Sequence, residues 1–299
     1  MLQTAPNIPD SIQRRYLPIK RNRIWEIDFI RGICVILMIL DHLSMLIASY
    51  FAPSWYGSAF YLGKAGDAFS LFCREWLNSD ARPIIHNVVL LFFFGVSGIS
   101  CTFSRSNFRR GGQLAVLAGI YSFCSLFAER VMGIHGVTTV FGVLNFLAAS
   151  MLLYALIEWA CKRDSNHISI VATGLIGITL ILYFCYTPPA DTPMFFATVF
   201  PPVDAYGNKS LFYTQSIFSP GDLFTMIPYT AYYFLGVLLA PLLYGKRKSL
   251  LPALDGKWNK PVCFTGRHAL WVYILHLVAM AGILALISGL FITPGNFGF

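Results

Sequence analysis

Four ionisable residues lie in an apolar stretch that is long enough to be most of a membrane-spanning helix. The stretch is DFIRGICVILMILDH, residues 28–42, and it contains Asp28, Arg31, Asp41 and His42. In an α-helix, the eleven residues from Arg31 to His42 make three turns plus about 20°, so the two side chains share one face about 16 Å apart. Asp28 lies about 40° from His42 in this projection, and Asp41 points about 100° away, toward a neighbouring helix. Ionisable groups at such depth usually line a cavity or pathway, so the pattern indicates a function.

The types of these residues suit acid–base chemistry on a ligand that carries phosphates. A neutral His42 imidazole accepts a proton from an attacking hydroxyl or amine, while Asp41 or Asp28 orients neighbouring groups and stabilises the charged form. A guanidinium such as Arg31 binds phosphate oxygens bidentately. His42 as a nucleophile that carries the transferred group transiently is a variant of this mechanism. The structural alternative is that His42 and Asp41 only form hydrogen bonds between helices.

Composition places the stretch in an integral membrane protein. Mean hydropathy is +0.62, hydrophobic residues are 56% of the chain and charged residues 12%, which excludes an ordinary soluble domain of 299 residues. Seven apolar runs are long enough to cross a bilayer, within a range of six to eight. They fall near 29–51, 84–104, 113–128, 140–160, 168–186, 223–244 and 268–291, and the third is expected to be the shortest. The predicted fold is an all-α polytopic bundle.

The distribution of basic residues predicts a cytoplasmic N-terminus. With that orientation, 16 Lys and Arg residues fall inside, five fall outside (Lys64, Arg74, Arg82, Arg130 and Lys209), and Arg31 lies in the first span. The positive-inside rule therefore explains most of the net charge of +8, which is no argument for nucleic-acid binding. We expect a basic cytoplasmic segment at 1–23, one transmembrane domain at 24–292 and a short external tail at 293–299.

Weaker candidates lie near the ends of other spans. Ser104 and Arg105, at the inner end of the second span, and Arg267, at the start of the last, are placed to meet phosphates, although topogenic charge alone explains such arginines. His276 lies inside the last span, where it either reaches the same cavity as His42 or is satisfied by a neighbouring helix. Asp222 precedes the sixth span and either caps that helix or meets substrate.

Other residue types add little. The seven cysteines form no CxxC pair and no zinc-binding spacing with histidine, so no metal is expected. Cys73 and Cys185 are both placed to face the outside, where they either form a disulfide or pack separately.

Five blocks of the chain resemble one membrane family in their order. They are IDFIRGICVILMILDH, FFFGVSGISCTFSRSNFRRG, FGVLNFLAASMLLY, DLFTMIPYTAYYFLGVLLAPLLY and GRHALWVYILHL, spread over roughly residues 23–280. The chain is similar to the bacterial heparan-α-glucosaminide N-acetyltransferase catalytic-domain-like family. Arg31 and His42 also resemble the Arg-x10-His pattern of the wider transmembrane acyltransferase superfamily, where the histidine is taken as catalytic.

The resemblance implies an enzyme that carries an acyl group across the membrane. Acetyl-CoA or another acyl-CoA would be the cytoplasmic donor, and a glycan or lipid-linked sugar would accept the group from the opposite face. Asn145 stands where the family often has a histidine and joins His276 and Asp222 as a substrate-binding candidate. The expected location is the bacterial plasma (inner) membrane, with membrane lipids as partners and a homodimer as one option.

A transporter is the competing class. An Asp-His pair such as Asp41-His42 is also typical of a proton relay in a proton-coupled transporter or exporter. No inverted repeat is visible in the sequence, and no span is clearly broken by Gly and Pro at mid-depth. The enzyme interpretation is therefore preferred.

Overall fold

The computed structural model describes residues 24–52, 63–133, 136–188, 198–201 and 222–291. The predicted terminal segments, 1–23 and 293–299, lie outside this part of the chain, as does most of the connection between the fifth and sixth predicted spans, residues 187–222. Within it, the protein is built from helices, and the only β pairing is one isolated bridge between Phe141 and Leu223.

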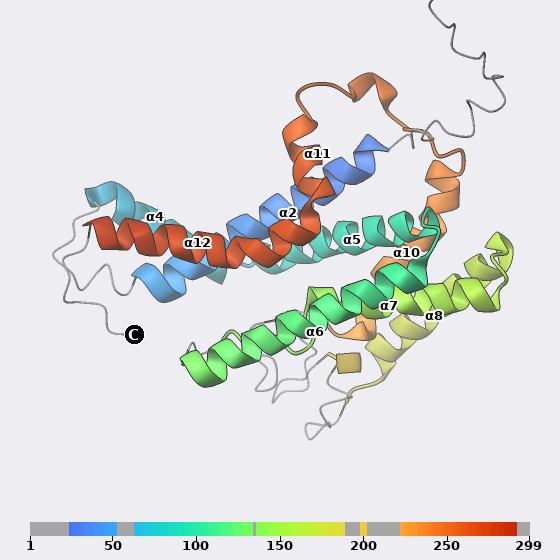
Figure 1. The fold of residues 1–299 in the computed structure, drawn as a ribbon, viewed down its shortest axis with the longest axis horizontal. Helices are drawn as coiled ribbons and strands as arrows, with labels where there is room; N and C mark the ends of the chain where they lie inside the picture. The colour runs from blue at the N-terminus through green and yellow to red at the C-terminus, as the bar shows by residue number, and fades with distance from the viewer. Residues whose placement is uncertain (1–23, 53–62, 134–135, 189–197, 202–221, 292–299) are drawn as a thin grey trace, which may run out of the picture.

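Seven described helices are long and apolar enough to cross a membrane, as the hydropathy pattern predicts. They are α2 (Trp25–Leu46, continued by a π-helical turn at Ile47–Phe51), α5 (Ala81–Thr102), α6 (Asn107–Met132), α7 (Val143–Ala160), α8 (Ser165–Cys185), α10 (Met226–Tyr244) and α12 (Ala269–Phe291). Two shorter helices, α4 (Gly63–Asn78) and α11 (Lys260–Arg267), lie at opposite ends of the bundle (Figure 1).

The third span differs from the expectation. It was expected to be the shortest, but α6 has 26 residues, and α7 with 18 is the shortest of the seven. Helix α6 begins in the polar segment at 107–113, before the apolar run. Backbone hydrogen bonds, and not the edge of the apolar segment, determine where a helix begins and ends. Its C-terminus is set by Gly133, whose φ of 71° allows the left-handed cap.

Two helix pairs pack at backbone distance because glycine faces the partner. A Cβ on Gly266 of α11 would overlap the carbonyl oxygen of Asp28 in α2, and a Cβ on Gly32 would overlap that of Val262. In the same way, Gly236 of α10 lies against the carbonyl of Gly95 in α5. Small residues allow this close approach between helices in membranes. The contact between α2 and α11 matters for function, because both helices carry charged residues there.

The centre of the bundle is aromatic. Phe94 of α5, Phe146 of α7 and the α10 residues Tyr229, Tyr233 and Phe234 are all at most 2% exposed. The distance between ring centroids is 4.5 Å for Phe94 and Phe146 and 5.6 Å for Phe94 and Tyr229. This core fixes α5, α7 and α10 together. On another side of α5, α2 packs alongside, and α12 lies against α2 (Figure 1).

Candidate functional site

Helix α2 places ionisable side chains in two separate clusters. Asp28 and Arg31 lie near its start and form what we call the arginine cluster, with Ser100 of α5 and Arg267 of α11. Asp41 and His42 lie farther along. They form the histidine cluster, which contains His276 of α12, Arg82 of α5 and Trp76 of α4. The rise per residue separates Arg31 from His42 by about 16 Å along the helix axis.

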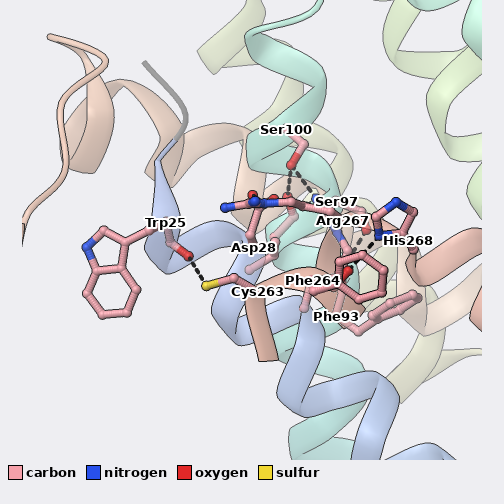
Figure 2. A network of polar contacts seen from close by, with 11 residues as sticks. Trp25, Asp28, Phe93, Ser97, Ser100, Cys263, Phe264, Arg267 and His268 are labelled. Carbon is pink, nitrogen blue, oxygen red and sulfur yellow. Dashed lines mark hydrogen bonds and ion pairs between the residues drawn. The ribbon is translucent and has the colours of Figure 1, made fainter. Parts of the chain in front are cut away.

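In the arginine cluster, one carboxylate holds two guanidinium groups. Asp28 Oδ2 lies 3.1 Å from Arg267 Nε, and Asp28 Oδ1 lies 3.7 Å from Arg31 Nη1. Arg31 Nη2 also donates to Ser100 Oγ at 2.6 Å. Figure 2 shows Asp28, Ser100 and Arg267 converging from three helices. The close contact at Gly266 brings Arg267 to α2 and so makes this cluster possible.

The arginine cluster fits a phosphate-bearing ligand. Two guanidinium groups and one carboxylate leave a net positive charge, and each guanidinium has five N–H donors, only some of which are used by Asp28 and Ser100. Arg110 of α6 is close enough to act electrostatically on Arg31. The side chains of Arg31 and Arg267 are 19% and 42% exposed, so part of each remains accessible. An anion with several oxygens matches this donor set.

Ser104 and Arg105 do not join this cluster in the described structure. They follow the end of α5, where the Ser104 N–H donates to the Cys101 carbonyl at 3.0 Å. The Arg105 carbonyl accepts from Arg163 Nη2 at 3.0 Å. The sequence correctly placed these residues at the end of the span, but it could not tell which arginine of the 105–110 segment acts on Arg31. The electrostatic contact belongs to Arg110.

In the histidine cluster, two imidazole rings from different helices are hydrogen-bonded. His42 Nδ1 lies 2.9 Å from His276 Nε2, and the ring centroids are 5.0 Å apart. His276 Nδ1 in turn lies 2.6 Å from the backbone carbonyl oxygen of Tyr273. His276 therefore reaches the same site as His42, which was the first of the two alternatives predicted for it.

Asp41 faces away from the imidazole pair, as the helical projection predicts. Its two carboxylate oxygens accept from Arg82 Nε and Nη2 at 2.8 and 2.9 Å, and Oδ1 also accepts from Trp76 Nε1 at 2.9 Å. This bidentate pair joins α2, α4 and α5. The contact that orients His42 comes from His276, and Asp41 instead neutralises Arg82.

Asp28 is not part of the site around His42, contrary to the expectation that grouped them. Fourteen residues separate the two along α2, which corresponds to about 21 Å of helix. The angular projection correctly gave a shared face, but a projection carries no depth. Asp28 belongs with the two arginines, where it balances charge and holds both guanidinium groups.

Asp222 bonds to Tyr273 and to the backbone of Val143, and Asn145 bonds to Ser122. Asp222 Oδ2 lies 3.4 Å from Tyr273 Oη, and its carboxylate accepts from the backbone N–H of Val143. Burial raises the pKa of Asp222 to about 7. Asp222 therefore accepts a hydrogen bond at the start of α7 and does not cap α10, whose N-cap is Thr225. Asn145 Oδ1 accepts from Ser122 Oγ at 3.5 Å and does not contact His42.

Sequence reasoning missed three members of this region. Arg82 was counted only as an external charge, and neither Trp76 nor His86 was singled out as a site residue. In the structure, His86 is one turn beyond Arg82 in α5 and is electrostatically coupled to Asp41 and His42. The spacing of Arg82 and His86, at i and i+4 where an apolar run begins, was the available signal.

The cysteines are free thiols, and they form no metal site with the other described residues. Cys73 is buried in α4, Cys185 is exposed at the end of α8, and both are free thiols, so no disulfide joins them. Among the described residues, no group of three or more His, Cys, Asp or Glu side chains is arranged to hold a metal ion.

The match to a known family spans the residues of both clusters. Residues 23–278 match the family described as heparan-alpha-glucosaminide N-acetyltransferase, catalytic. The chain belongs to this family. No curated protein and no solved structure gives a significant match to it. Membership in the heparan-alpha-glucosaminide N-acetyltransferase family implies a membrane-bound transferase, and the family in general uses acetyl-CoA as donor.

Proposed function

We propose that this protein transfers an acyl group from cytoplasmic acyl-CoA to an acceptor that is reached from the opposite face of the membrane. The observation that carries the proposal is the placement of two chemically different clusters on one transmembrane helix. The arginine cluster suits the phosphates of the donor, and the histidine cluster suits proton transfer during acyl transfer. The extended pantetheine arm of CoA is suited to bridge the distance of about 16 Å between them.

The arginine cluster would hold the donor at the cytoplasmic side. Arg31 and Arg267 would contact phosphate oxygens, with Asp28 keeping both guanidinium groups in place and Ser100 fixing Arg31. Arg31 matters most, because it lies deeper in the bundle and is less exposed than Arg267. This orientation rests on the positive-inside rule, which assigns 16 basic residues of the sequence to the cytoplasmic side.

The histidine cluster would carry the chemistry. An acceptor hydroxyl or amine attacks the thioester carbonyl as His42 removes its proton, so a bond forms from the acceptor heteroatom to the acyl carbon. The carbon–sulfur bond breaks, and the CoA sulfur leaves with the proton that His42 returns. Membership in an N-acetyltransferase family supports an acetyl group and a sugar acceptor. We place the protein in the plasma (inner) membrane of a bacterium.

The transporter alternative receives less support from the same contacts. A proton relay through Asp41 needs a carboxylate that is available to exchange protons with His42. Both oxygens of Asp41 are instead bound by Arg82. A bidentate guanidinium favours a permanently ionised carboxylate.

A two-sided assay tests the proposal. The purified protein is reconstituted in sealed vesicles, with labelled acetyl-CoA on one side and an amino-sugar acceptor on the other. Transfer predicts free CoA on the donor side and acetylated acceptor on the opposite side in equal amounts. Movement of unmodified substrate with no loss of thioester would instead establish transport.

A further inference from the structure

The hydrogen bonds of His276 determine which of its ring nitrogens carries a proton. His276 Nδ1 lies 2.6 Å from the carbonyl oxygen of Tyr273, three residues earlier in α12. A carbonyl oxygen can only accept, so His276 Nδ1 must donate and must carry hydrogen. In the neutral ring, Nε2 is then an acceptor with a free lone pair.

The next contact carries this assignment to His42. His276 Nε2 faces His42 Nδ1 at 2.9 Å. Because the neutral His276 ring can only accept at Nε2, His42 must donate from Nδ1. His42 Nε2 is then left without a proton, with its lone pair directed away from His276. A hydrogen-bonded partner on one ring nitrogen commonly fixes the tautomer of a functional histidine in this way.

A charged His276 is the alternative, and its surroundings oppose it. The imidazolium form would donate from both nitrogens and reverse the contact with His42. His276 is only 6% exposed, and no carboxylate contacts it among the residues that the structure describes. An unpaired cation at membrane depth is costly, so the neutral form is favoured.

We propose that His276 is a positioning residue that holds His42 in the Nδ1–H tautomer and so makes His42 Nε2 the proton acceptor of the reaction. This inference rests on the proposed acyl transfer and adds which atom acts and what holds it. Asp41, the adjacent carboxylate, does not take this role because both of its oxygens are bound by Arg82. The bond also strengthens when His42 becomes charged, because a charged donor forms the stronger hydrogen bond.

The assignment fixes the path of the proton. The acceptor heteroatom forms its bond to the thioester carbon while its proton moves to His42 Nε2. The carbon–sulfur bond then breaks, and the same proton passes from Nε2 to the departing CoA sulfur. The Nδ1 proton of His42 remains on the bond to His276 throughout, because beyond His276 the chain of contacts ends at a carbonyl that cannot take a proton.

The first test observes the tautomer directly and needs no enzymatic activity. Full-length protein with ¹⁵N-labelled histidine rings is measured by NMR, and the His42 signals are assigned by their loss in His42→Asn. We expect wild-type His42 to carry its proton on Nδ1. A proton on Nε2 of wild-type His42 would overturn the inference.

The second test compares two replacements of similar size. Gln in His276→Gln can place its amide oxygen where Nε2 was, so His42 keeps its donor bond, whereas Leu in His276→Leu fills space but accepts nothing. We expect kcat to fall about 100-fold in His276→Leu and less than about tenfold in His276→Gln, with the donor KM unchanged in both. His42 should shift toward the Nε2–H tautomer only in the leucine variant.

The outcomes separate this inference from the proposed function. Equal kcat values for the two variants would show that His276 only fills space and would overturn the inference, whereas an active His42→Asn protein would overturn acyl transfer through His42. His167→Asn is the matched control, because His167 is an exposed histidine that bonds to Asp164 outside both clusters. This control should leave both kcat and the His42 tautomer unchanged.

Discussion

Single side chains in this protein differ mainly in whether their charge is already balanced. Asp41 has a complete bidentate partner in Arg82, so it carries a fixed charge. Arg31 has one distant carboxylate contact at 3.7 Å and a hydroxyl, and several of its donors remain for a ligand. Asp222 is buried, and its carboxylate accepts from the Tyr273 hydroxyl and from backbone N–H groups. These three environments predict different responses to mutation and to pH.

The donor-binding role of Arg31 predicts that charge alone is insufficient at this position. Arg31→Lys keeps the positive charge but loses the planar fork, and we expect acyl-CoA affinity to fall about tenfold, which corresponds to one charge-assisted hydrogen bond. Calorimetric titration with a non-hydrolysable acyl-CoA analogue measures this. Arg109→Lys, at an exposed position of α6 outside both clusters, should bind normally. Unchanged affinity in Arg31→Lys would remove Arg31 from the donor site.

The environment of Asp222 predicts a pH-dependent stability. Burial raises its pKa to about 7 from an ordinary 3.8, so between these values the folded protein binds more protons than the unfolded chain. The stability from this group is fully present below pH 3.8 and is lost as the pH rises to about 7. Asp222→Asn can still accept from Val143 but has no charge to bury. We expect its melting temperature at pH 8 to exceed that of wild type by about 3 °C, with no gain at pH 4. Parallel melting curves at both pH values would contradict this.

Among the helices, α2 and its close partner α11 determine where the arginines lie. Gly266 and Gly32 allow the two backbones to touch, and this contact carries Arg267 to Asp28. The sequence predicted that Arg31 and His42 share a face, because helical periodicity fixes that angle. It did not predict which residues from other helices meet that face, because contacts such as His42 with His276 depend on how α12 is placed against α2. Counting charges likewise assigned Arg82 to one side of the membrane but did not predict its partly buried ion pair with Asp41.

The α2–α11 contact gives a prediction with an internal control. Alanine normally stabilises a helix relative to glycine by about 1 kcal/mol. At Gly119 of α6, where an added Cβ meets nothing within 4 Å, Gly119→Ala should be neutral or stabilising. Gly266→Ala instead forces α11 away from the Asp28 carbonyl, so we expect a lower melting temperature and weaker acyl-CoA binding. A Gly266→Ala protein with wild-type melting and donor binding would show that this contact does not position Arg267.

Across the whole molecule, the proposed transfer requires the two clusters to face opposite sides of the membrane. Exposed positions mark the two ends: Asp80 precedes α5 near the histidine cluster, and Lys257 precedes α11 near the arginine cluster. A membrane-impermeant maleimide added to intact cells should label Asp80→Cys and leave Lys257→Cys unlabelled until the cells are opened, with the wild-type chain as background. The reverse pattern would invert the proposed direction of transfer.

The central claim is that His42 accepts the proton during acyl transfer, and one variant tests it most directly. His42→Asn keeps a polar side chain for interhelical bonding but cannot accept a proton near neutral pH. We predict that purified, monodisperse His42→Asn protein binds acyl-CoA normally, because the arginine cluster is about 16 Å away, and loses transfer by about 10²-fold or more. Transfer at the wild-type rate by this variant would contradict the account and leave His42 with a purely structural role.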